Sequence, residues 1–389
     1  MAPTARAPRS PPDPERRRLV AVGEPAPLFV QACTNNPRFE LGLAAGRYIV
    51  LCFFGSAGDA SGQDLLSVLA SRRSLFDDDN IAFFGVSADP ADEARVFQDL
   101  PGIRFFWDFD LEASRLYGSV LEDAPSPPQS YRRQWFVLDP TLRVMGRGDA
   151  GEQGEGAGAL IAVLESLPPA SRFAGVELQA PILYLPNVFE PEFCRRLIAY
   201  HQTRPSQASG VMREREGRTV AVEQDRFKRR LDCTIQDPDL VGMIQSRIAR
   251  RVAPEILKVH QFKATRMERY LVGCYDSQDG GHFRAHRDNT TRGTRHRRFA
   301  VSVNLNDDFE GGEIAFPEYG PRRFKPPAGA AVVFSCSLLH AVSPMTRGRR
   351  YVFLPFLYDE DAARTREASA QDSAGGERAR TKRGQGRRR

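Results

Sequence analysis

Two continuous apolar runs in the first half of the chain constrain its fold most strongly. They are YIVLCFF (48–54) and IAFFGVS (81–87). Strands that are covered on both faces carry such runs, whereas strands with one wet face alternate apolar and polar residues. A helical pattern, LLSVLASRRSLF (65–76), lies between the two runs. This order predicts a β-α-β unit around a central, covered sheet.

The second half of the chain has a different pattern. Helices are predicted near Pro191 to Thr203 and near Pro238 to Lys258, and short strands at close spacing then continue to residue 358. A long loop is predicted from about Ser206 to Arg230, and loops of that length often act as lids or binding loops. The order favours a β-barrel or jelly roll fronted by helices.

A seam between two domains is predicted near residues 168 to 178. The Gly-rich stretch before it leads into a short amphipathic helix from about Ala157 to Leu167, which Pro168 and Pro169 end. Lys and Arg minus Asp and Glu give −9 for residues 19–174 and +7 for residues 175–360. We therefore expect an α/β domain at 19–170 and a β domain at 178–360.

Both ends of the chain are predicted to be disordered tails. Residues 1–18 and 361–389 are rich in Pro, Gly, Ser and charge and poor in apolar residues. Their net charges are +3 and +5. Clustered basic residues suit nucleic-acid phosphates, but no stacking aromatics accompany them, so we expect no nucleic-acid partner.

The chain also has features that bear on its compartment. No apolar run reaches the roughly 20 residues that a membrane helix needs, and the Pro- and Arg-rich start does not resemble a signal peptide. The six cysteines form no C-x-x-C pair, which argues against a disulfide scaffold or a zinc knuckle. A soluble, cytoplasmic protein without membrane contact is expected.

Three residues form a candidate metal site. In GGHFRAHRDN, His286 and Asp288 are two positions apart, a spacing that puts both side chains on one face of a strand. His340 ends the run GAAVVFSCSLLH, which is predicted to be a central strand. Two imidazoles and one carboxylate suit non-haem iron(II), because this set leaves coordination positions open for a 2-oxo acid and dioxygen.

A candidate anchor for the cosubstrate follows the distal histidine by ten residues. Arg350 lies in HAVSPMTRGRRYVF, and its guanidinium can hold the far carboxylate of 2-oxoglutarate by paired hydrogen bonds. Arg349 should point to the other face of the strand.

The second half of the chain resembles the prolyl 4-hydroxylase alpha-subunit family over roughly residues 180 to 358. The resemblance rests on three motifs: Y-x-x-x-D-G-G-H-F-x-x-H-x-D, NLNDDFEGGEIAFPE and P-M-x-x-G-x-R-Y. The resemblance implies a double-stranded β-helix that binds Fe(II), 2-oxoglutarate and O2 and uses L-ascorbate as a helper. By the same resemblance Tyr275 assists Arg350 in binding the cosubstrate, and Asn304 is a further pocket candidate.

The first half resembles peroxiredoxins of the alkyl hydroperoxide reductase type. The resemblance rests on VGEPAPLF (22–29), the two apolar runs and RRQWFVLDP (132–140), and it implies a thioredoxin fold. The segment between Gly55 and Asp64 lacks the threonine and the cysteine of the family's T-x-x-C element, although Arg133 matches its activating arginine. A docking module, a residual thiol-redox unit and a spacer remain open as its role.

Taken together, the residues predict a dioxygenase that hydroxylates a protein, a peptide or a small molecule while it converts 2-oxoglutarate and O2 to succinate and CO2. An alternative is a non-catalytic sensor, with a vestigial peroxiredoxin domain and an iron-binding jelly roll. Neither the substrate nor the oligomeric state follows from the sequence.

Overall fold

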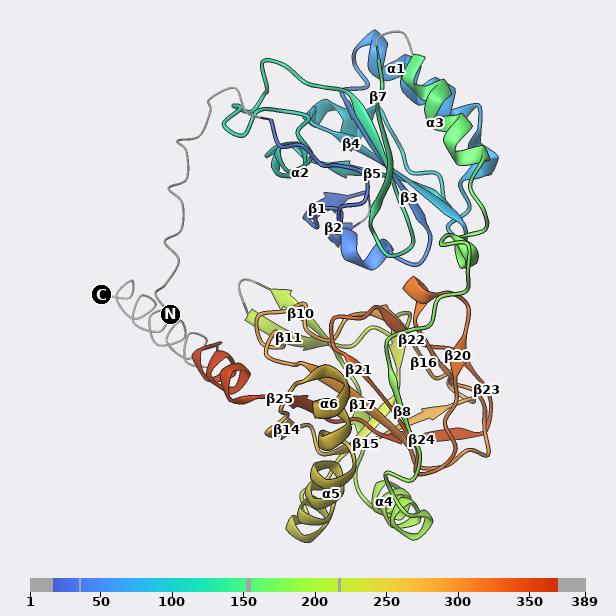
Figure 1. Ribbon diagram of the computed structural model, residues 1–389, viewed down its shortest axis with the longest axis vertical. Coiled ribbons are helices and arrows are strands. Elements are labelled where there is room, and N and C mark those ends of the chain that lie inside the picture. The colour runs from blue at the N-terminus through green and yellow to red at the C-terminus, as the bar shows by residue number, and fades with distance from the viewer. Residues whose placement is uncertain (1–16, 35, 152–154, 216–217, 370–389) are drawn as a thin grey trace, which may run out of the picture. The chain divides into compact units, whose positions relative to one another are not determined.

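The computed structural model describes residues 17–34, 36–151, 155–215 and 218–369 (Figure 1). Apart from Glu318–Gly320, the chain divides into two compact units between Leu178 and Gln179. Both units combine helices and β-sheets, so the fold is of the mixed α/β type. Within the described residues, no helix combines the length and the apolar character needed to cross a membrane.

The first unit is built on one seven-stranded sheet. Its strand order is β2-β1-β5-β4-β3-β6-β7, in which β3 pairs in parallel with β4 and antiparallel with β6. The strands are β1 (Val30–Cys33), β2 (Asn36–Glu40), β3 (Tyr48–Gly55), β4 (Ile81–Ser87), β5 (Ile103–Trp107), β6 (Gln134–Leu138) and β7 (Val144–Asp149). Every residue of β3 and β4 is buried, as the two apolar runs predict.

Helices cover both faces of this sheet. Helix α1 (Ala60–Ala70) and helix α3 (Glu155–Glu165) lie side by side over the face that carries Val50 and Phe54 (Figure 1). On the other face, Tyr117 of α2 (Glu112–Tyr117) packs against Phe53 at a ring distance of 5.0 Å. Successive β3 side chains therefore point to opposite, covered faces.

Helix α1 begins one turn earlier than the sequence pattern predicts. The side chain of Asp59 accepts a hydrogen bond from Gly62 N and caps the helix. The helix ends at Ala70, and the second half of the predicted segment contains the 3-10 turn Arg73–Leu75.

The second unit contains a five-stranded and a nine-stranded sheet. The five-stranded sheet has the order β12-β16-β22-β19-β20, and the nine-stranded sheet follows the path β14-β25-β17-β24-β15-β13-β9. Off this path, β21 pairs with β17, and β8 pairs with β21. The strands of the five-stranded sheet are β12 (Lys228–Arg229), β16 (His282–His286), β19 (Ile314–Ala315), β20 (Arg323–Phe324) and β22 (His340–Val342). Those of the nine-stranded sheet are β8 (Leu183–Leu185), β9 (Gln207–Ala208), β13 (Leu231–Thr234), β14 (Arg266–Glu268), β15 (Leu271–Asp276), β17 (Phe299–Asn304), β21 (Ala331–Ser335), β24 (Arg349–Phe353) and β25 (Phe356–Tyr358).

Three helices pack against the nine-stranded sheet. Helix α4 (Pro191–Thr203) matches its predicted bounds. The predicted helix from Pro238 to Lys258 is two helices, α5 (Pro238–Arg251) and α6 (Ala253–His260). The break falls at Val252, because Pro254 has no N–H to continue the α5 hydrogen-bond ladder.

The loop predicted from Ser206 to Arg230 is largely extended in the structure. It contains β9 and β12, and β10 (Val211–Arg215) pairs with β11 (Arg218–Val222) as an antiparallel hairpin. The β-branched residues of RTVAV in β11 favour a strand, a signal that the many charges around them obscure. A further two-stranded sheet pairs β18 (Glu310–Gly311) with β23 (Met345–Arg347).

Part of the predicted C-terminal tail is ordered. Residues 360–369 are helical, and Ala362 is fully buried. Asp359 caps this helix by accepting a hydrogen bond from Ala362 N at 2.9 Å. The prediction of disorder was therefore wrong for residues 361–369, while residues 1–16 and 370–389 lie outside the described residues.

Candidate active site

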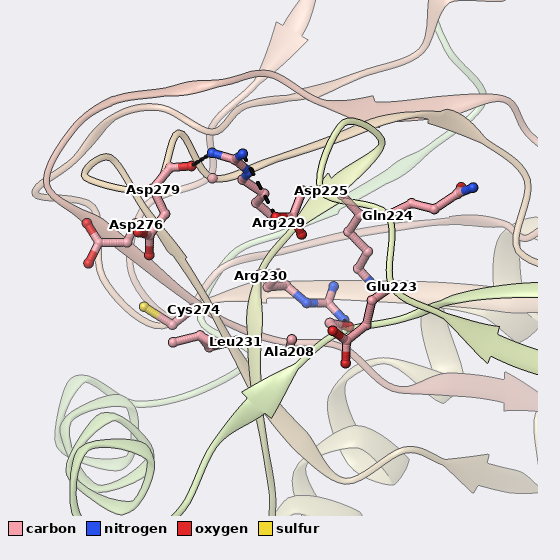
Figure 2. Close-up of a pocket in the computed structure, with 13 residues that line it drawn as sticks. Ala208, Glu223, Gln224, Asp225, Arg229, Arg230, Leu231, Cys274, Asp276 and Asp279 are labelled. Carbon is pink, nitrogen blue, oxygen red and sulfur yellow. Dashed lines mark hydrogen bonds and ion pairs between the residues drawn. The ribbon is translucent and has the colours of Figure 1, made fainter.

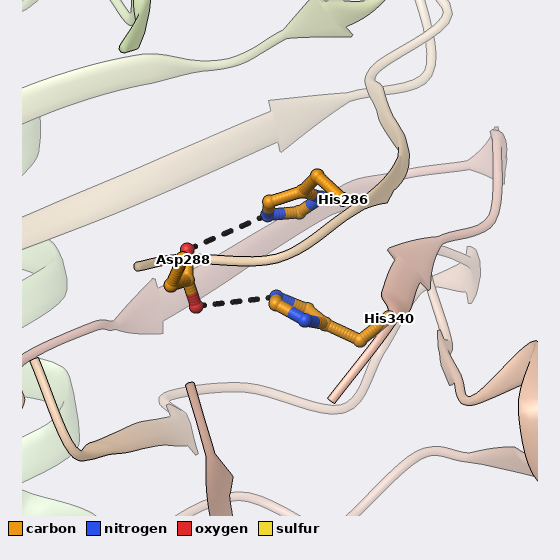
Figure 3. A group of neighbouring side chains, drawn as sticks. All are labelled: His286, Asp288 and His340. Carbon is orange, nitrogen blue, oxygen red and sulfur yellow. Dashed lines mark ion pairs between the residues drawn. The ribbon is translucent and has the colours of Figure 1, made fainter. Parts of the chain in front are cut away.

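His286, Asp288 and His340 meet at the end of two neighbouring strands (Figure 3). His286 is the last residue of β16, Asp288 lies in the turn that follows, and His340 is the first residue of β22. The sheet register places His286 opposite His340. One potential ligand atom from each side chain lies within 4.8 Å of the other two.

The two imidazoles present their Nε2 atoms to the carboxylate. His286 Nε2 lies 3.6 Å from Asp288 Oδ1, and His340 Nε2 lies 3.4 Å from Asp288 Oδ2. Each Nδ1 faces a backbone carbonyl, that of Arg284 at 2.8 Å and that of Leu338 at 3.0 Å. A hydrogen on Nδ1 satisfies these contacts and leaves Nε2 with a free lone pair, as a metal ligand requires.

The surroundings of the triad keep the second imidazole neutral. Burial, and next the proximity of His286, lower the pKa of His340 to about 4. The ring of His286 stacks on Phe283 with centroids 3.5 Å apart, and His340 packs against Phe334 at 4.6 Å. These aromatic contacts fix the orientation of both rings.

The predicted central strand that ends at His340 is two strands in the structure. Strand β21 ends at Ser335 in the nine-stranded sheet, and His340 opens β22 in the five-stranded sheet. The chain therefore passes from the nine-stranded sheet to the five-stranded sheet between Ser335 and His340. Because both segments are apolar and buried, the sequence shows no boundary between them.

Arg350 is a buried cation with neutral partners. Its side chain is only 1% exposed. Its Nε donates to Asn304 Oδ1 at 3.0 Å and its Nη2 donates to Ser302 Oγ at 3.0 Å. Burial lowers its pKa to about 10. Within the described part of the chain no carboxylate pairs with it, and a buried charge without a counter-ion is costly, so the position suits an incoming anion.

The other predicted site residues lie around Arg350. Tyr275 is opposite Arg350 in the β15–β24 register, and the guanidinium carbon of Arg350 lies 5.6 Å from the Tyr275 ring centroid. Asn304 does not line the pocket; it holds Arg350 and donates from Nδ2 to Pro326 O at 2.7 Å. Arg349 is exposed and binds Asp276, so the two arginines point to opposite faces as predicted.

A pocket between the two sheets joins these groups. Its wall includes the triad and Arg350 together with residues that the sequence did not single out, among them Arg230, Arg269, Phe283, Ser302, Leu354 and Phe356. Ser302 lies two residues before Asn304 on β17, so strand periodicity could have indicated it. The arginines carry no such signal, because the surrounding sequence is rich in basic residues.

A second cavity of about 320 Å³ adjoins this pocket and shares Arg230 with it (Figure 2). Arg229 bridges its rim, since its Nη1 donates to Asp279 O at 2.8 Å and its Nη2 lies 3.9 Å from Asp225 Oδ2. Glu223 and Asp276 add further carboxylates to the lining. The rim is therefore acidic, whereas the wall shared with the metal pocket is basic.

In the first unit, a carboxylate, that of Asp59, lies in the segment between Gly55 and Asp64 in which the resemblance to peroxiredoxins implies a reactive cysteine. Asp59 caps α1 and binds Arg133 Nη2, and Arg133 Nε donates to Phe54 O at 3.0 Å. All six cysteines are buried and unpaired. Burial raises the pKa of Cys52 to about 12. A buried thiol with that pKa is a poor nucleophile.

Part of the sequence of the second unit matches a known family model. Residues 269–358 match the 2OG-Fe(II) oxygenase superfamily. This segment begins at Arg269 and contains the triad, Tyr275, Asn304 and Arg350. The resemblance of the C-terminal half to 2-oxoglutarate oxygenases is therefore confirmed.

Curated relatives match the same half of the chain. The chain is 36% identical over 107 residues to the PKHD-type hydroxylase PiuC of Pseudomonas aeruginosa, an alignment that covers 24% of this chain and 46% of that protein. A PKHD-type hydroxylase of Stutzerimonas stutzeri is 35% identical over 107 residues, with the same coverage. The chain thus spans less than half the length of these curated relatives.

Solved structures resemble parts of the chain at low sequence identity and low TM-score. A Pseudomonas putida prolyl-4-hydroxylase has a TM-score of 0.37 and 16% identity, and the alignment covers 47% of this chain and 94% of that one. The bacterioferritin comigratory protein of Xanthomonas campestris has a TM-score of 0.30 and 18% identity, with 36% and 90% covered.

Proposed function

We propose that this protein is an Fe(II)- and 2-oxoglutarate-dependent dioxygenase that hydroxylates an organic substrate. The carrying observation is the arrangement of two histidines and one carboxylate in the same pocket as a buried arginine that pairs with no carboxylate of the described residues. The family match of residues 269–358 supports the same chemistry. Bound iron would supply the oxidative decarboxylation of 2-oxoglutarate by O2 to succinate and CO2, in which one oxygen atom enters succinate and the other hydroxylates the substrate.

The donor set fits iron(II). His286 Nε2, His340 Nε2 and an Asp288 oxygen form one compact group, and the imidazoles are oriented by hydrogen bonds from Nδ1. Two histidines and one carboxylate are typical of non-haem iron sites with open positions, whereas structural zinc sites more often have four protein ligands.

Arg350 would bind the far carboxylate of 2-oxoglutarate. Asn304 and Ser302 already hold its Nε and Nη2, which fixes the guanidinium plane and leaves Nη1 for the ligand. Tyr275 lies over the same guanidinium and narrows the space around it. The apolar wall formed by Phe283, Leu354 and Phe356 would exclude water from the reacting groups.

We also propose a specific fold for each of the two units, based on their sheets and helices. The covered sheet of residues 19–170, with helices on both faces, suits a thioredoxin-like domain. The two sheets of residues 178–360, with the metal pocket between them, suit a double-stranded β-helix with flanking helices. The first domain would act as a docking module or a spacer, since the segment between Gly55 and Asp64 contains no cysteine and the cysteines elsewhere in the domain are buried.

Three further assignments belong to this proposal. L-ascorbate would restore the iron after turnover without substrate. The substrate would be a protein, a peptide or a small molecule, and we propose no nucleic-acid substrate or partner. Cytoplasmic localisation is in keeping with six buried cysteines that form no disulfide.

The assignment of ligands can be tested by spectroscopy under anaerobic conditions. Bidentate binding of 2-oxoglutarate to Fe(II) gives a visible charge-transfer absorption band. We expect the wild-type protein to form this band, His340→Ala to lose it, and Arg350→Ala to need a higher 2-oxoglutarate concentration. Metal binding without the band would instead favour the non-catalytic sensor.

A further inference from the structure

Arg269 lies in the metal pocket but has no part in the cosubstrate site described above. It falls between β14 and β15 and lines the same pocket as the triad and Arg350. Its backbone has φ +66°, a left-handed conformation that long side chains rarely adopt. Conformations of this kind persist where the surrounding structure holds them, often at ligand sites.

The guanidinium of Arg269 is poorly neutralised. Within the described part of the chain it reaches one acceptor, Asp232 Oδ2, at 3.4 Å. That carboxylate is already bound by Arg230, whose Nε and Nη2 donate to its two oxygens at 2.6 and 2.8 Å, and Ser209 Oγ also donates to it. Two guanidinium groups therefore share one carboxylate, and Arg230 makes the shorter contacts.

The charged groups of the pocket leave an excess of positive charge. Arg230, Arg269 and Arg350 line the pocket and Lys228 lies over the ring of Phe283 in its wall, whereas the neighbouring carboxylates are those of Asp288 and Asp232. Iron(II) would add two positive charges and 2-oxoglutarate two negative ones, so the cofactors would cancel each other. With 2-oxoglutarate at Arg350, Arg269 would be the arginine with the weakest neutralisation, because its ion pair with Asp232 is longer than that of Arg230.

The position of Arg269 separates it from the cosubstrate anchor. It stacks on Phe356 with the guanidinium carbon 5.4 Å from the ring centroid, and Arg297 lies over the same ring at 4.1 Å. Arg297 also donates to Asp288 O at 3.5 Å, so this ring lies on the metal side of the pocket. Arg350 is instead held by Asn304 and Ser302.

From these contacts we propose that Arg269 is a specificity-determining residue that binds an anionic group of the primary substrate, next to the metal and apart from Arg350. This rests on the proposed function. The occupant would have an apolar body, which suits Phe283 and Leu354 in the wall, and one carboxylate or similar anion for Arg269.

The test uses the full chain loaded with Mn(II) and N-oxalylglycine, a non-reactive analogue of 2-oxoglutarate that occupies the Arg350 site. Three probes of similar size are titrated and followed by ¹⁹F NMR: 3,3,3-trifluoropropionate, its neutral amide of the same shape, and the cationic 3,3,3-trifluoropropylamine. Mn(II) broadens the signal of a probe that binds close to the metal. We expect strong broadening for the carboxylate alone.

Variants identify the group responsible. Arg269→Gln should weaken binding of the carboxylate on the order of tenfold or more, because a charge-assisted hydrogen bond is lost. Arg269→Lys should retain part of it, and Arg266→Gln should retain all of it, since Arg266 is an exposed residue paired with Glu360. Thermal unfolding checks that each variant is folded.

The outcomes separate the two proposals. Failure of the wild type to bind Mn(II) and N-oxalylglycine would overturn the proposed function itself. With that binding intact, the assignment of Arg269 would be overturned by equal broadening of all three probes, by no broadening of any, or by carboxylate binding that survives in Arg269→Gln.

Discussion

Arg350 Nε donates to Asn304 Oδ1 at 3.0 Å, and both side chains are buried beside the candidate metal ligands. The neutral amide of Asn304 thus orients the guanidinium of Arg350, and no carboxylate in the described part of the chain neutralises that charge. Because the amide adds no negative charge, the guanidinium keeps its full attraction for a carboxylate ligand. This pairing is the structural basis for placing 2-oxoglutarate at Arg350.

Removing this cation should weaken cosubstrate binding. Arg350→Ala loses charge-assisted hydrogen bonds worth about 1.5–3 kcal/mol each, so we expect the KM for 2-oxoglutarate to rise roughly 10- to 100-fold. The measurement is succinate formation against 2-oxoglutarate concentration. Arg349→Ala is the matched control, since Arg349 is exposed and binds Asp276. An equal effect of the two substitutions would contradict the assignment.

Replacing the amide of Asn304 by a carboxylate should weaken 2-oxoglutarate binding more than removing the amide. Asn304→Asp would place a negative charge against Arg350 and compete with the cosubstrate, whereas Asn304→Ala would only release one hydrogen bond. We expect the KM for 2-oxoglutarate to rise several-fold in Asn304→Ala and further in Asn304→Asp. The reverse order, with both proteins folded, would show that Asn304 does not act through the charge of Arg350.

The first unit should be stabilised by Asp59 and should lack peroxidase activity. Asp59→Ala removes the cap of α1 and the partner of Arg133, so unfolding of this unit should become easier by about 1 kcal/mol. Urea unfolding followed by tryptophan fluorescence reports on this unit, because Trp107 and Trp135 both lie in it. Peroxide consumption by the wild type that is lost in Cys52→Ser would refute the reading of the cysteines as structural.

Acid should weaken a buried cluster around Glu268. The carboxyl is desolvated, which raises its pKa, but hydrogen bonds and charges from His296 and Arg297 outweigh this and lower the pKa from 4.5 to about 2. Arg366 also faces it at 3.4 Å. Because the folded-state pKa is the lower one, the stabilisation is present above pH 4.5 and is lost as the pH falls towards 2.

Glu268→Gln isolates this contribution. The lowered pKa of Glu268 corresponds to a stabilisation of the folded state by about 3 kcal/mol at pH 7. We expect the difference in unfolding free energy between the wild type and the variant to shrink by more than half between pH 7 and pH 3, as measured by urea unfolding. A difference that stays constant over this range would contradict the lowered pKa.

The residues of the candidate site could be predicted because their chemistry is rare and their spacing is restrictive. His286 and Asp288 are separated by one residue, so strand geometry brings their side chains to the same face. The ten-residue spacing between His340 and Arg350 was informative as part of the motif that resembles the prolyl 4-hydroxylase family, since the two residues lie on different strands, β22 and β24. The covered strands β3 and β4 were likewise evident, since an uninterrupted apolar run suits few other environments.

Other features depend on contacts that a local pattern does not contain. The hairpin of β10 and β11 lies in a charged segment, and the switch between sheets from Ser335 to His340 falls within one apolar run. The helix at 360–369 is stabilised by the cap at Asp359 and by burial of Ala362, in a stretch whose composition suggested disorder. Arg269 carries no signal in the sequence, because only the folded structure shows that it shares the carboxylate of Asp232 with Arg230.

Succinate formation tests the central assignment most directly. Protein loaded anaerobically with Fe(II) is given 2-oxoglutarate, ascorbate and air, and succinate is compared between the wild type, His340→Ala, Arg350→Ala and Arg349→Ala. We expect succinate from the wild type and from Arg349→Ala, none from His340→Ala, and little from Arg350→Ala unless 2-oxoglutarate is raised. Succinate formation by His340→Ala at the wild-type rate would contradict the assignment of the metal site and, with it, the proposed oxygenase.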